Sequence, residues 1–252
     1  MKGNLRFMWQ DLKRAVSLKG FWISIMLLLT LFFHAINLYV SLDREISTYE
    51  IIVDAMALSG FGPFAAVFPS IGYSVRVCEE YNSGYMKMIT SRMNPKCYGI
   101  VRTISVGLSG GIMVGFPFLV VCLFAFLFGV HGIPQDGFME ESQLVYYIAQ
   151  YGDWFVLLFK VFLGFLFGVL FSLVSLAFAI WTCNRYVTII APFVLYEVMW
   201  VVLYNVQILN PIYLVRGDDL NSYPLSCFME IIYIAVTLIV IWIGWKKKVW
   251  YE

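Results

Sequence analysis

Six long apolar stretches constrain this chain more than any other feature of its sequence. A membrane-spanning helix needs about 20 mostly apolar residues, because the hydrocarbon core of a bilayer is about 30 Å thick. Only 13% of the residues are charged and 61% are hydrophobic, far from the composition of a soluble domain. We therefore predict an all-α polytopic membrane protein, a single transmembrane domain over residues 1–252. Its six predicted spans cover residues 20–42, 55–78, 104–130, 154–183, 187–209 and 226–245.

The basic residues are distributed unequally between the two sides of such a six-span chain. Fourteen of the 17 Lys and Arg residues fall in the N-terminal segment, the second and fourth connections and the C-terminus. Two of the remaining three, Arg44 and Arg216, lie in connections that are otherwise acidic. Because loops rich in Lys and Arg stay in the cytoplasm, we predict that both termini are cytoplasmic.

Residues 2–19 have the pattern of an amphipathic helix that precedes the first span. Apolar residues recur at helical spacing on one face, and Phe7 interrupts the pattern. Such a helix is expected to lie in the inner membrane interface, with its lysines toward anionic lipid headgroups. The apolar face consists of Leu5, Met8, Trp9, Leu12 and Val16.

The connection between the second and third spans, residues 79–102, has features of a docking segment. Residues 85–90 predict a short amphipathic helix, and the Asn94-Pro95 pair predicts a break before the third span. Met86, Ile89 and Met93 offer an apolar side to a soluble partner. The alternative is an ordinary solvated loop that obeys the positive-inside rule.

The same connection places Glu80, Gly84, Lys87 and Ile89 at a spacing that resembles the coupling loop of ABC transporter permeases of the type-2 exporter class. The six-span layout with an interfacial helix is also similar to that family. Pro95 stands where a small polar residue is common, and Arg102 stands where Lys is usual. The positions proposed for coupling are Glu79, Glu80, Gly84, Lys87, Ile89, Arg92, Lys96, Tyr98 and Arg102.

The resemblance implies a permease subunit of the bacterial cytoplasmic membrane that is not an enzyme by itself. It would form a dimer with a second copy or a paralogue, and a separate nucleotide-binding subunit would drive export. ATP and Mg would bind to that partner, with no cofactor or metal in this chain, and the sequence has no G-x-x-x-x-G-K-[ST] phosphate loop. Relatives export peptides, antibiotics, lipids and polysaccharides, and this sequence does not choose among them. The net charge of +1 gives no indication of nucleic-acid binding.

Four ionisable residues within the predicted spans are hypotheses for substrate contact or gating, because charges at membrane depth are costly. They are His34, Lys160, Glu197 and Glu230. Structural interpretations compete with this one: Lys160 and Glu197 would form a buried bridge if their depths matched. Alternatively, Lys160 and Glu230 would reach the membrane interface.

Glycines spaced by four residues predict close helix packing in two spans. They are Gly107, Gly111 and Gly115 in the third span and Gly164 and Gly168 in the fourth. We favour packing within one chain over a seam between two copies.

Two other classes of protein compete with the permease hypothesis. A self-sufficient secondary transporter or channel would need a polar midplane site with broken helices, often in inverted repeats, and the sequence shows no internal repeat. The Glu79-Glu80 pair is similar to that of CAAX-protease-like intramembrane peptidases. However, Gly84 replaces the Arg that such a site needs, and the only histidines are His34 and His131.

Overall fold

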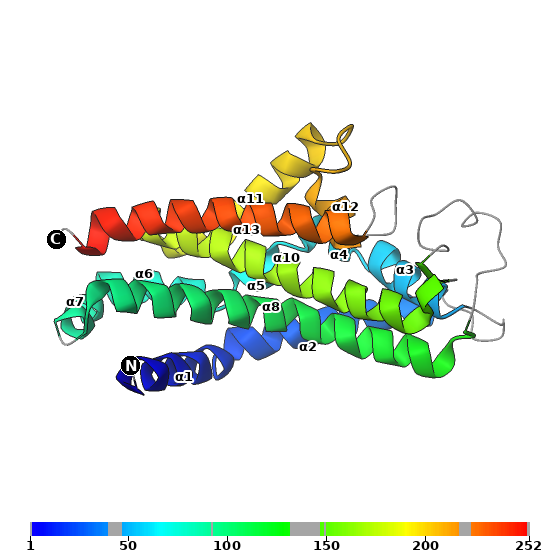
Figure 1. Cartoon of the computed structure of the whole chain (residues 1–252), viewed down its shortest axis with the longest axis horizontal. Helices are drawn as coiled ribbons and strands as arrows, with labels where there is room; N and C mark the ends of the chain where they lie inside the picture. The colour runs from blue at the N-terminus through cyan, green and yellow to red at the C-terminus, as the bar shows by residue number, and fades with distance from the viewer. Residues whose placement is uncertain are drawn as a thin grey trace.

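The computed structural model describes residues 2–39, 47–91, 93–131, 147–148, 150–216 and 223–250. Long helices run along one common axis, and shorter helices connect or flank them (Figure 1). The elements are α1 (Lys2–Val16), α2 (Lys19–Tyr39), α3 (Thr48–Leu58), α4 (Phe61–Phe64), α5 (Val67–Ser70), α6 (Ser74–Asn82), α7 (Tyr85–Thr90), α8 (Pro95–Phe128), α10 (Asp153–Thr182), α11 (Arg185–Val202), α12 (Pro211–Arg216), α13 (Tyr223–Trp245) and the π-helical η1 (Lys246–Trp250).

Five of these helices, α2, α8, α10, α11 and α13, are long and apolar enough to cross a membrane. A sixth crossing exists if α3 and the segment 61–82 count as one span, and this pair is bent by 58°. Apolar side chains cover much of the outer surface of these helices, and Leu127 and Val202, for example, are more than 70% exposed. An apolar surface of this extent needs lipid around it. The architecture agrees with the predicted all-α polytopic membrane fold.

The predicted second span over residues 55–78 is not a continuous helix. Gly60 has a φ of 70°, in the left-handed region, and Pro63 and Pro69 follow it. Proline removes a backbone donor and crowds the preceding turn. The chain therefore advances through α3, α4, α5 and α6 as short helices that change direction.

Hydroxyl groups from neighbouring helices donate to backbone carbonyls of this broken segment. Non-helical backbone at membrane depth needs such partners, because lipid offers none. Three side chains donate to it: Ser24 of α2 to the Phe68 carbonyl (3.4 Å), Tyr196 of α11 to the Gly62 carbonyl (2.6 Å), and Ser175 of α10 to the Ser70 carbonyl (3.4 Å). Contacts with the neighbouring helices of the bundle thus stabilise the break.

The two longest helices, α8 and α10, meet at a seam of glycines. A Cβ atom on Gly168 would lie 2.3 Å from the carbonyl oxygen of Gly110, and one on Gly164 would lie 2.7 Å from the Phe118 ring. Gly111 and Gly115 similarly face Phe165 of α10. The glycines predicted to pack helices therefore lie at a contact within one chain, where backbones approach closely.

Two helix boundaries differ from the predicted spans by more than one helical turn. The third span begins at Pro95, well before residue 104, because the Asn94 side chain caps the helix by accepting the Lys96 N–H at 3.0 Å. The fifth span ends at Val202 instead of residue 209. There Asn210 donates to the Trp200 carbonyl and accepts the Ile212 N–H, both at 3.2 Å, so that the chain turns back into α12.

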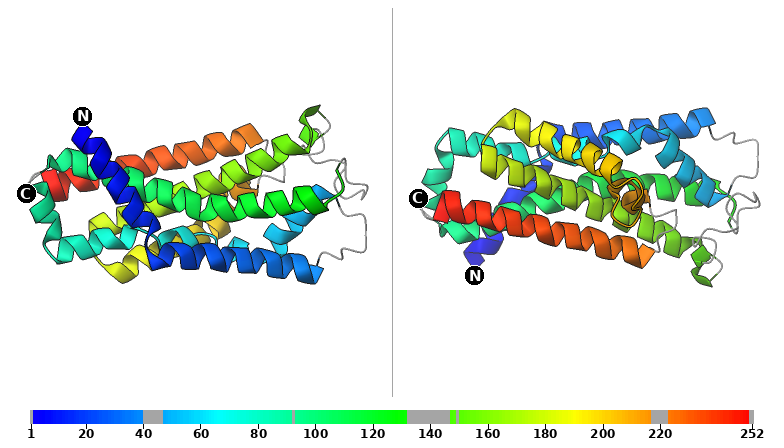
Figure 2. Two further views of the ribbon diagram at one scale, coloured as in Figure 1. Left: turned by 90° about the horizontal axis from the view of Figure 1, so that it is seen from below. Right: turned by 90° about the horizontal axis from the view of Figure 1, so that it is seen from above.

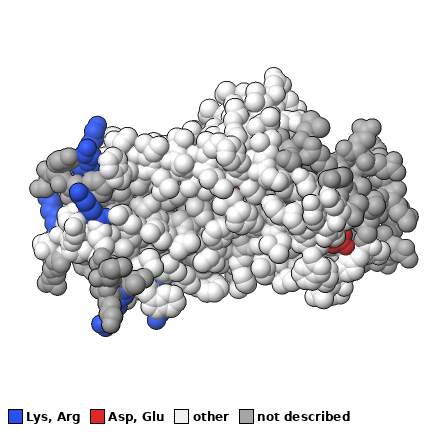
Figure 3. All heavy atoms as spheres, viewed as in Figure 1, with Lys and Arg blue, Asp and Glu red and all other residues white. Residues whose placement is uncertain are grey.

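The two ends of the bundle differ in charge. Helices α1, α7 and η1 all lie at the same end (Figure 1), and α1 crosses that end at an angle to α2 (Figure 2). On the face shown in Figure 3, Lys and Arg atoms gather at this end. We refer to it as the basic end.

Candidate functional site

A buried ion cluster joins three helices at the basic end. The guanidinium of Arg102 on α8 donates from Nη1 to Asp11 Oδ1 of α1 at 2.7 Å, and from Nη2 to Glu80 Oε2 of α6. Arg102 and Asp11 are each 1% exposed, and Glu80 is 5% exposed. The arginine therefore supplies the buried positive charge that two buried carboxylates need.

Two tyrosines complete the cluster. Tyr73 donates to Asp11 Oδ1 at 2.6 Å, and Tyr98 donates to Glu80 Oε2 at 2.7 Å. The Arg102 guanidinium carbon also lies 4.6 Å from the centre of the Tyr73 ring and 5.4 Å from that of Tyr98, within the range of a cation–π contact. We define the buried ion cluster as Asp11, Tyr73, Glu80, Tyr98 and Arg102.

The buried ion cluster acts as a structural clamp that holds helices together. Its charged groups are enclosed and paired with one another, so that a substrate has no access to them. Charge-assisted hydrogen bonds of this kind are strong and directional. The half-exposed Arg14 adds a second positive charge 3.6 Å from Glu80 Oε1. The cluster therefore fixes α1, α6 and α8 relative to one another.

The short helix α7 lies beside this clamp at the basic end (Figure 1). Gly84 joins it to α6 with a φ of 72°, which glycine adopts without strain. Met86 is 5% exposed and belongs to the core, and Ile89 and Met93 pack against the same core cluster. Met86 is therefore not available to a partner as predicted, and Ile89 and Met93 are only partly accessible because they pack against the bundle.

The opposite side of α7 is exposed and carries apolar, polar and charged side chains. Tyr85 is 40% exposed and Met88 is 59% exposed, and Lys87 and Ser91 are exposed beside them. A hollow of about 600 Å³ lies next to this side. It is lined by residues that include Asn82, Lys87, Thr90 and Lys248. We refer to Tyr85, Lys87, Met88 and Ser91 as the α7 surface.

The residues proposed for coupling fall into two groups. Glu80, Tyr98 and Arg102 are buried in the ion cluster, and Ile89 faces inward. The other described positions are reachable from outside: Gly84, Lys87 and Lys96 at least in part, and Glu79, which pairs with Arg76 at 2.7 Å and Arg185 at 3.8 Å. Arg92 lies outside the described residues.

Sequence reasoning missed Asp11 and Tyr73. Asp11 is the only acidic residue among the first 42, which was a usable signal. Phe7, treated as an interruption of the amphipathic pattern, packs against the core, and Asp11 and Ala15 are buried at the following helical positions. One face of α1 is therefore directed at the bundle, while Trp9 is 60% exposed on another face.

The four ionisable residues within the spans do not form one site. His34 is exposed on α2, Glu197 is half-buried on α11, and Lys160 donates to the Arg216 carbonyl. No hydrogen bond or ion pair in the described part of the chain joins two of the four. Lys160 and Glu230 are at most 1% exposed, so neither side chain lies on the outer surface of the bundle.

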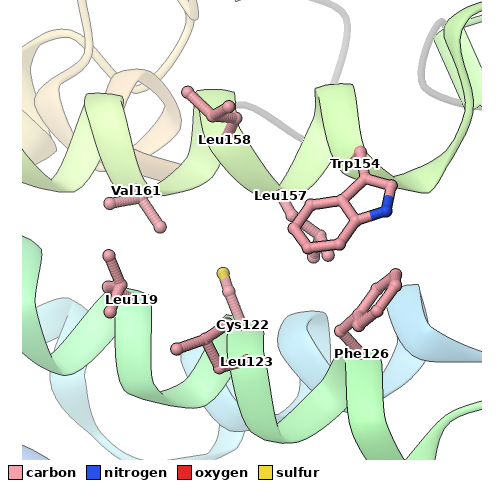
Figure 4. A pocket seen from close by; sticks show the side chains of 8 residues that line it. All are labelled: Leu119, Cys122, Leu123, Phe126, Trp154, Leu157, Leu158 and Val161. Carbon is pink, nitrogen blue, oxygen red and sulfur yellow. The ribbon is translucent and has the colours of Figure 1, made fainter.

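An apolar groove of about 280 Å³ separates α8 and α10 at the end of the bundle opposite to the basic end (Figure 4). The rings of Phe126 and Trp154 lie 4.2 Å apart at its mouth. Beyond them His131 Nδ1 lies 3.1 Å from Asp153 Oδ2. The groove is lined by Leu119, Cys122, Leu123, Phe126, Trp154, Leu157, Leu158 and Val161. Its shape and chemistry suit an apolar chain.

These features define the class of the protein as an all-α integral membrane protein. At its basic end, a buried ion cluster holds three helices together. No protein-family model, curated protein or solved structure matches the chain. A more specific assignment therefore depends on the sequence resemblance together with the geometry of the α7 surface and the ion cluster.

Proposed function

We propose that this chain is the transmembrane permease subunit of an ATP-driven ABC exporter of the type-2 class. A separate nucleotide-binding subunit binds ATP and Mg and docks on the α7 surface, at the cytoplasmic side of a bacterial cytoplasmic membrane. The observation that carries the proposal is a short helix with an exposed face, held at the basic end of the bundle by a buried ion cluster. Such a helix offers a soluble partner a groove-binding segment.

The ion cluster gives this surface a mechanical connection to the spans. A displacement of α7 acts on α6 through Gly84, and Glu80 transmits it to Arg102 of α8 and Asp11 of α1. Helix α8 has 34 residues, and at 1.5 Å per residue it extends about 50 Å. A push at the basic end therefore acts on a single continuous helix that extends to the opposite end.

The permease works as a dimer with a second copy or a paralogue. Glu197 is our candidate for contact with substrate, because a carboxyl at membrane depth is expected to face water or another protein. Its helix α11 buries few residues within the bundle. The apolar groove favours a lipid-like or amphipathic substrate over a strongly polar one, and peptides and antibiotics with apolar parts remain within this class.

Purification from native membranes with recovery of bound proteins tests the proposal. We expect a stoichiometric ATPase to co-purify with the wild-type chain and to be lost with the double variant Lys87→Glu/Met88→Ala. Met26→Ala is the matched control, because Met26 is also exposed, at 62%, but lies on α2 away from α7. Wild-type chain without an ATPase would refute the function, and unchanged recovery in the double variant would refute docking at α7.

A self-sufficient secondary transporter or channel is the second candidate. The observation that favours it is the broken segment α3–α6, since transporters of that kind use interrupted helices near the membrane centre. Reconstitution of the purified chain alone separates the two hypotheses. Solute movement driven by an ion gradient without any ATPase would support the secondary transporter.

A further inference from the structure

Glu230 on α13 is a buried carboxyl group without a partner. It is 1% exposed, and neither carboxyl oxygen has a hydrogen-bond partner in the described part of the chain. Ser226, one turn earlier on the same helix, is fully buried, and its hydroxyl oxygen also lacks a partner there. Buried polar atoms almost always have partners in native proteins, so this pair needs an explanation.

The residues that flank Glu230 on α13 pack in a mostly apolar cluster. Cys227 and Ile234, which flank it on the same helix, belong to or pack against an apolar cluster that includes Leu163 and Leu166 of α10. The other titratable groups of α13 are Tyr223, Cys227 and Tyr233, and the Tyr233 hydroxyl donates to the Leu209 carbonyl at 2.7 Å.

The basic groups on the neighbouring elements do not neutralise this carboxyl. They are Lys160 on α10 and Arg216 on α12, and neither forms an ion pair with Glu230. The Lys160 ammonium instead donates to the Arg216 carbonyl. Glu230 is therefore not half of a structural salt bridge.

The cost of burying a charge determines the protonation state of such a carboxyl group. An isolated carboxylate inside an apolar medium is so costly that the group takes up a proton instead. Protein atoms enclose Glu230, so surrounding lipid would add no stabilisation to the charge. A hard cation is a weaker explanation, because it needs about six or more oxygen ligands. Glu230 and Ser226 together offer it one carboxyl and one hydroxyl.

We propose that Glu230 is a proton-binding site of the bundle. The carboxylate binds one proton to form the neutral acid while α13 packs against α10, and it exchanges that proton with water when the two helices separate. The step needs no co-reactant except the proton itself. It goes beyond the proposed ATP-driven function, because it makes the rearrangement of the spans sensitive to a proton gradient.

Infrared spectroscopy of the purified chain in liposomes tests the site without knowledge of the substrate or the ATPase. A protonated carboxylic acid has a carbonyl stretch that is separate from those of carboxylates and amides. We expect this band at neutral pH in the wild type, its loss in Glu230→Gln, and its retention in Glu197→Gln. Glutamine has nearly the same shape as the neutral acid, so the first variant is expected to fold.

Two further observations decide between a working site and a fixed structural acid. We expect the band to shift after transfer to heavy water, which shows exchange with bulk solvent, and to be unaffected by sodium or lithium ions. A missing band, or a band that also persists in Glu230→Gln, would overturn the proposal. So would a band that never shifts in heavy water, or one that disappears when sodium binds. None of these results depends on whether an ATPase docks on α7.

Discussion

Arg102 on α8 and Asp11 on α1 form an ion pair of 2.7 Å across 91 residues of sequence. The pair is 1% exposed at both ends, so that neither water nor salt screens it. Through the same guanidinium, Asp11 is connected to Glu80 at the end of α6. The N-terminal helix is therefore attached to the segment that leads directly into α7, which relates the membrane-surface helix to the proposed docking surface.

Removal of the arginine should be strongly destabilising. Arg102→Met leaves the buried Asp11 without a counter-charge and Glu80 with only the half-exposed Arg14, and breaking a buried ion pair in this way costs about 3–5 kcal/mol. Thermal denaturation of the purified chain in detergent measures the loss. The control is Arg76→Met, which removes the partly exposed pair with Glu79 and should cost about 0–1 kcal/mol. Equal losses in the two variants would contradict a central role for the cluster.

The glycine seam between α8 and α10 predicts that alanine has different effects on stability at two of its glycines. In Gly168→Ala the new methyl group would lie 2.3 Å from the Gly110 carbonyl oxygen, so the backbones of α8 and α10 must separate, at a cost of about 1–3 kcal/mol. In Gly107→Ala the nearest atom is a Leu173 methyl at 3.5 Å, an ordinary contact. We expect that variant to change stability little or to increase it slightly. A stable Gly168→Ala protein would show that the helices do not pack this closely.

Gly84 allows a test of backbone conformation without a change in packing. No atom lies within 4 Å of a Cβ built at this position, and φ is 72°. A β-branched residue is strained in this region by about 1–2 kcal/mol, whereas asparagine tolerates it better. We therefore expect Gly84→Val to lose the co-purifying ATPase and Gly84→Asn to keep most of it. Equal loss in both variants would indicate that glycine is needed for contact with the partner.

Most of the fold could be predicted from apolar windows, because hydropathy reports which segments lie in lipid. The windows located α2, α8, α10, α11 and α13. They did not reveal that the segment from 55 to 78 is broken, because an average over residues does not register the left-handed backbone at Gly60. Helix ends depended on single capping residues. Asn94 was recognised as a break but not as the first cap of a longer helix.

The candidate site was harder to predict because it depends on packing. The resemblance to a permease coupling loop singles out Glu80 and Arg102 by their spacing in the sequence. This spacing gives no indication that both side chains are buried. Their contact with Asp11 exists only because α1 packs against α8, and no local pattern specifies that contact. The inward direction of Met86 follows from the same cause: at a bundle end, an amphipathic helix buries its apolar face against its own chain before it meets a partner.

The proposed docking depends most on the prediction that the basic end faces the cytoplasm. A membrane-impermeant maleimide distinguishes the two faces if a cysteine is placed at each end. Lys87→Cys lies on the α7 surface, and Tyr151→Cys replaces a residue that is 55% exposed immediately before α10, at the opposite end. The wild-type chain, with its own five cysteines, supplies the background.

Because the lysine- and arginine-rich end is expected in the cytoplasm, Tyr151→Cys should be labelled in intact cells. Lys87→Cys should be labelled above background only after the membrane is opened. The reverse pattern would place α7 outside the cell, where a subunit that consumes cytoplasmic ATP has no access to it. The ion cluster would then remain a structural clamp, but the permease proposal would fail.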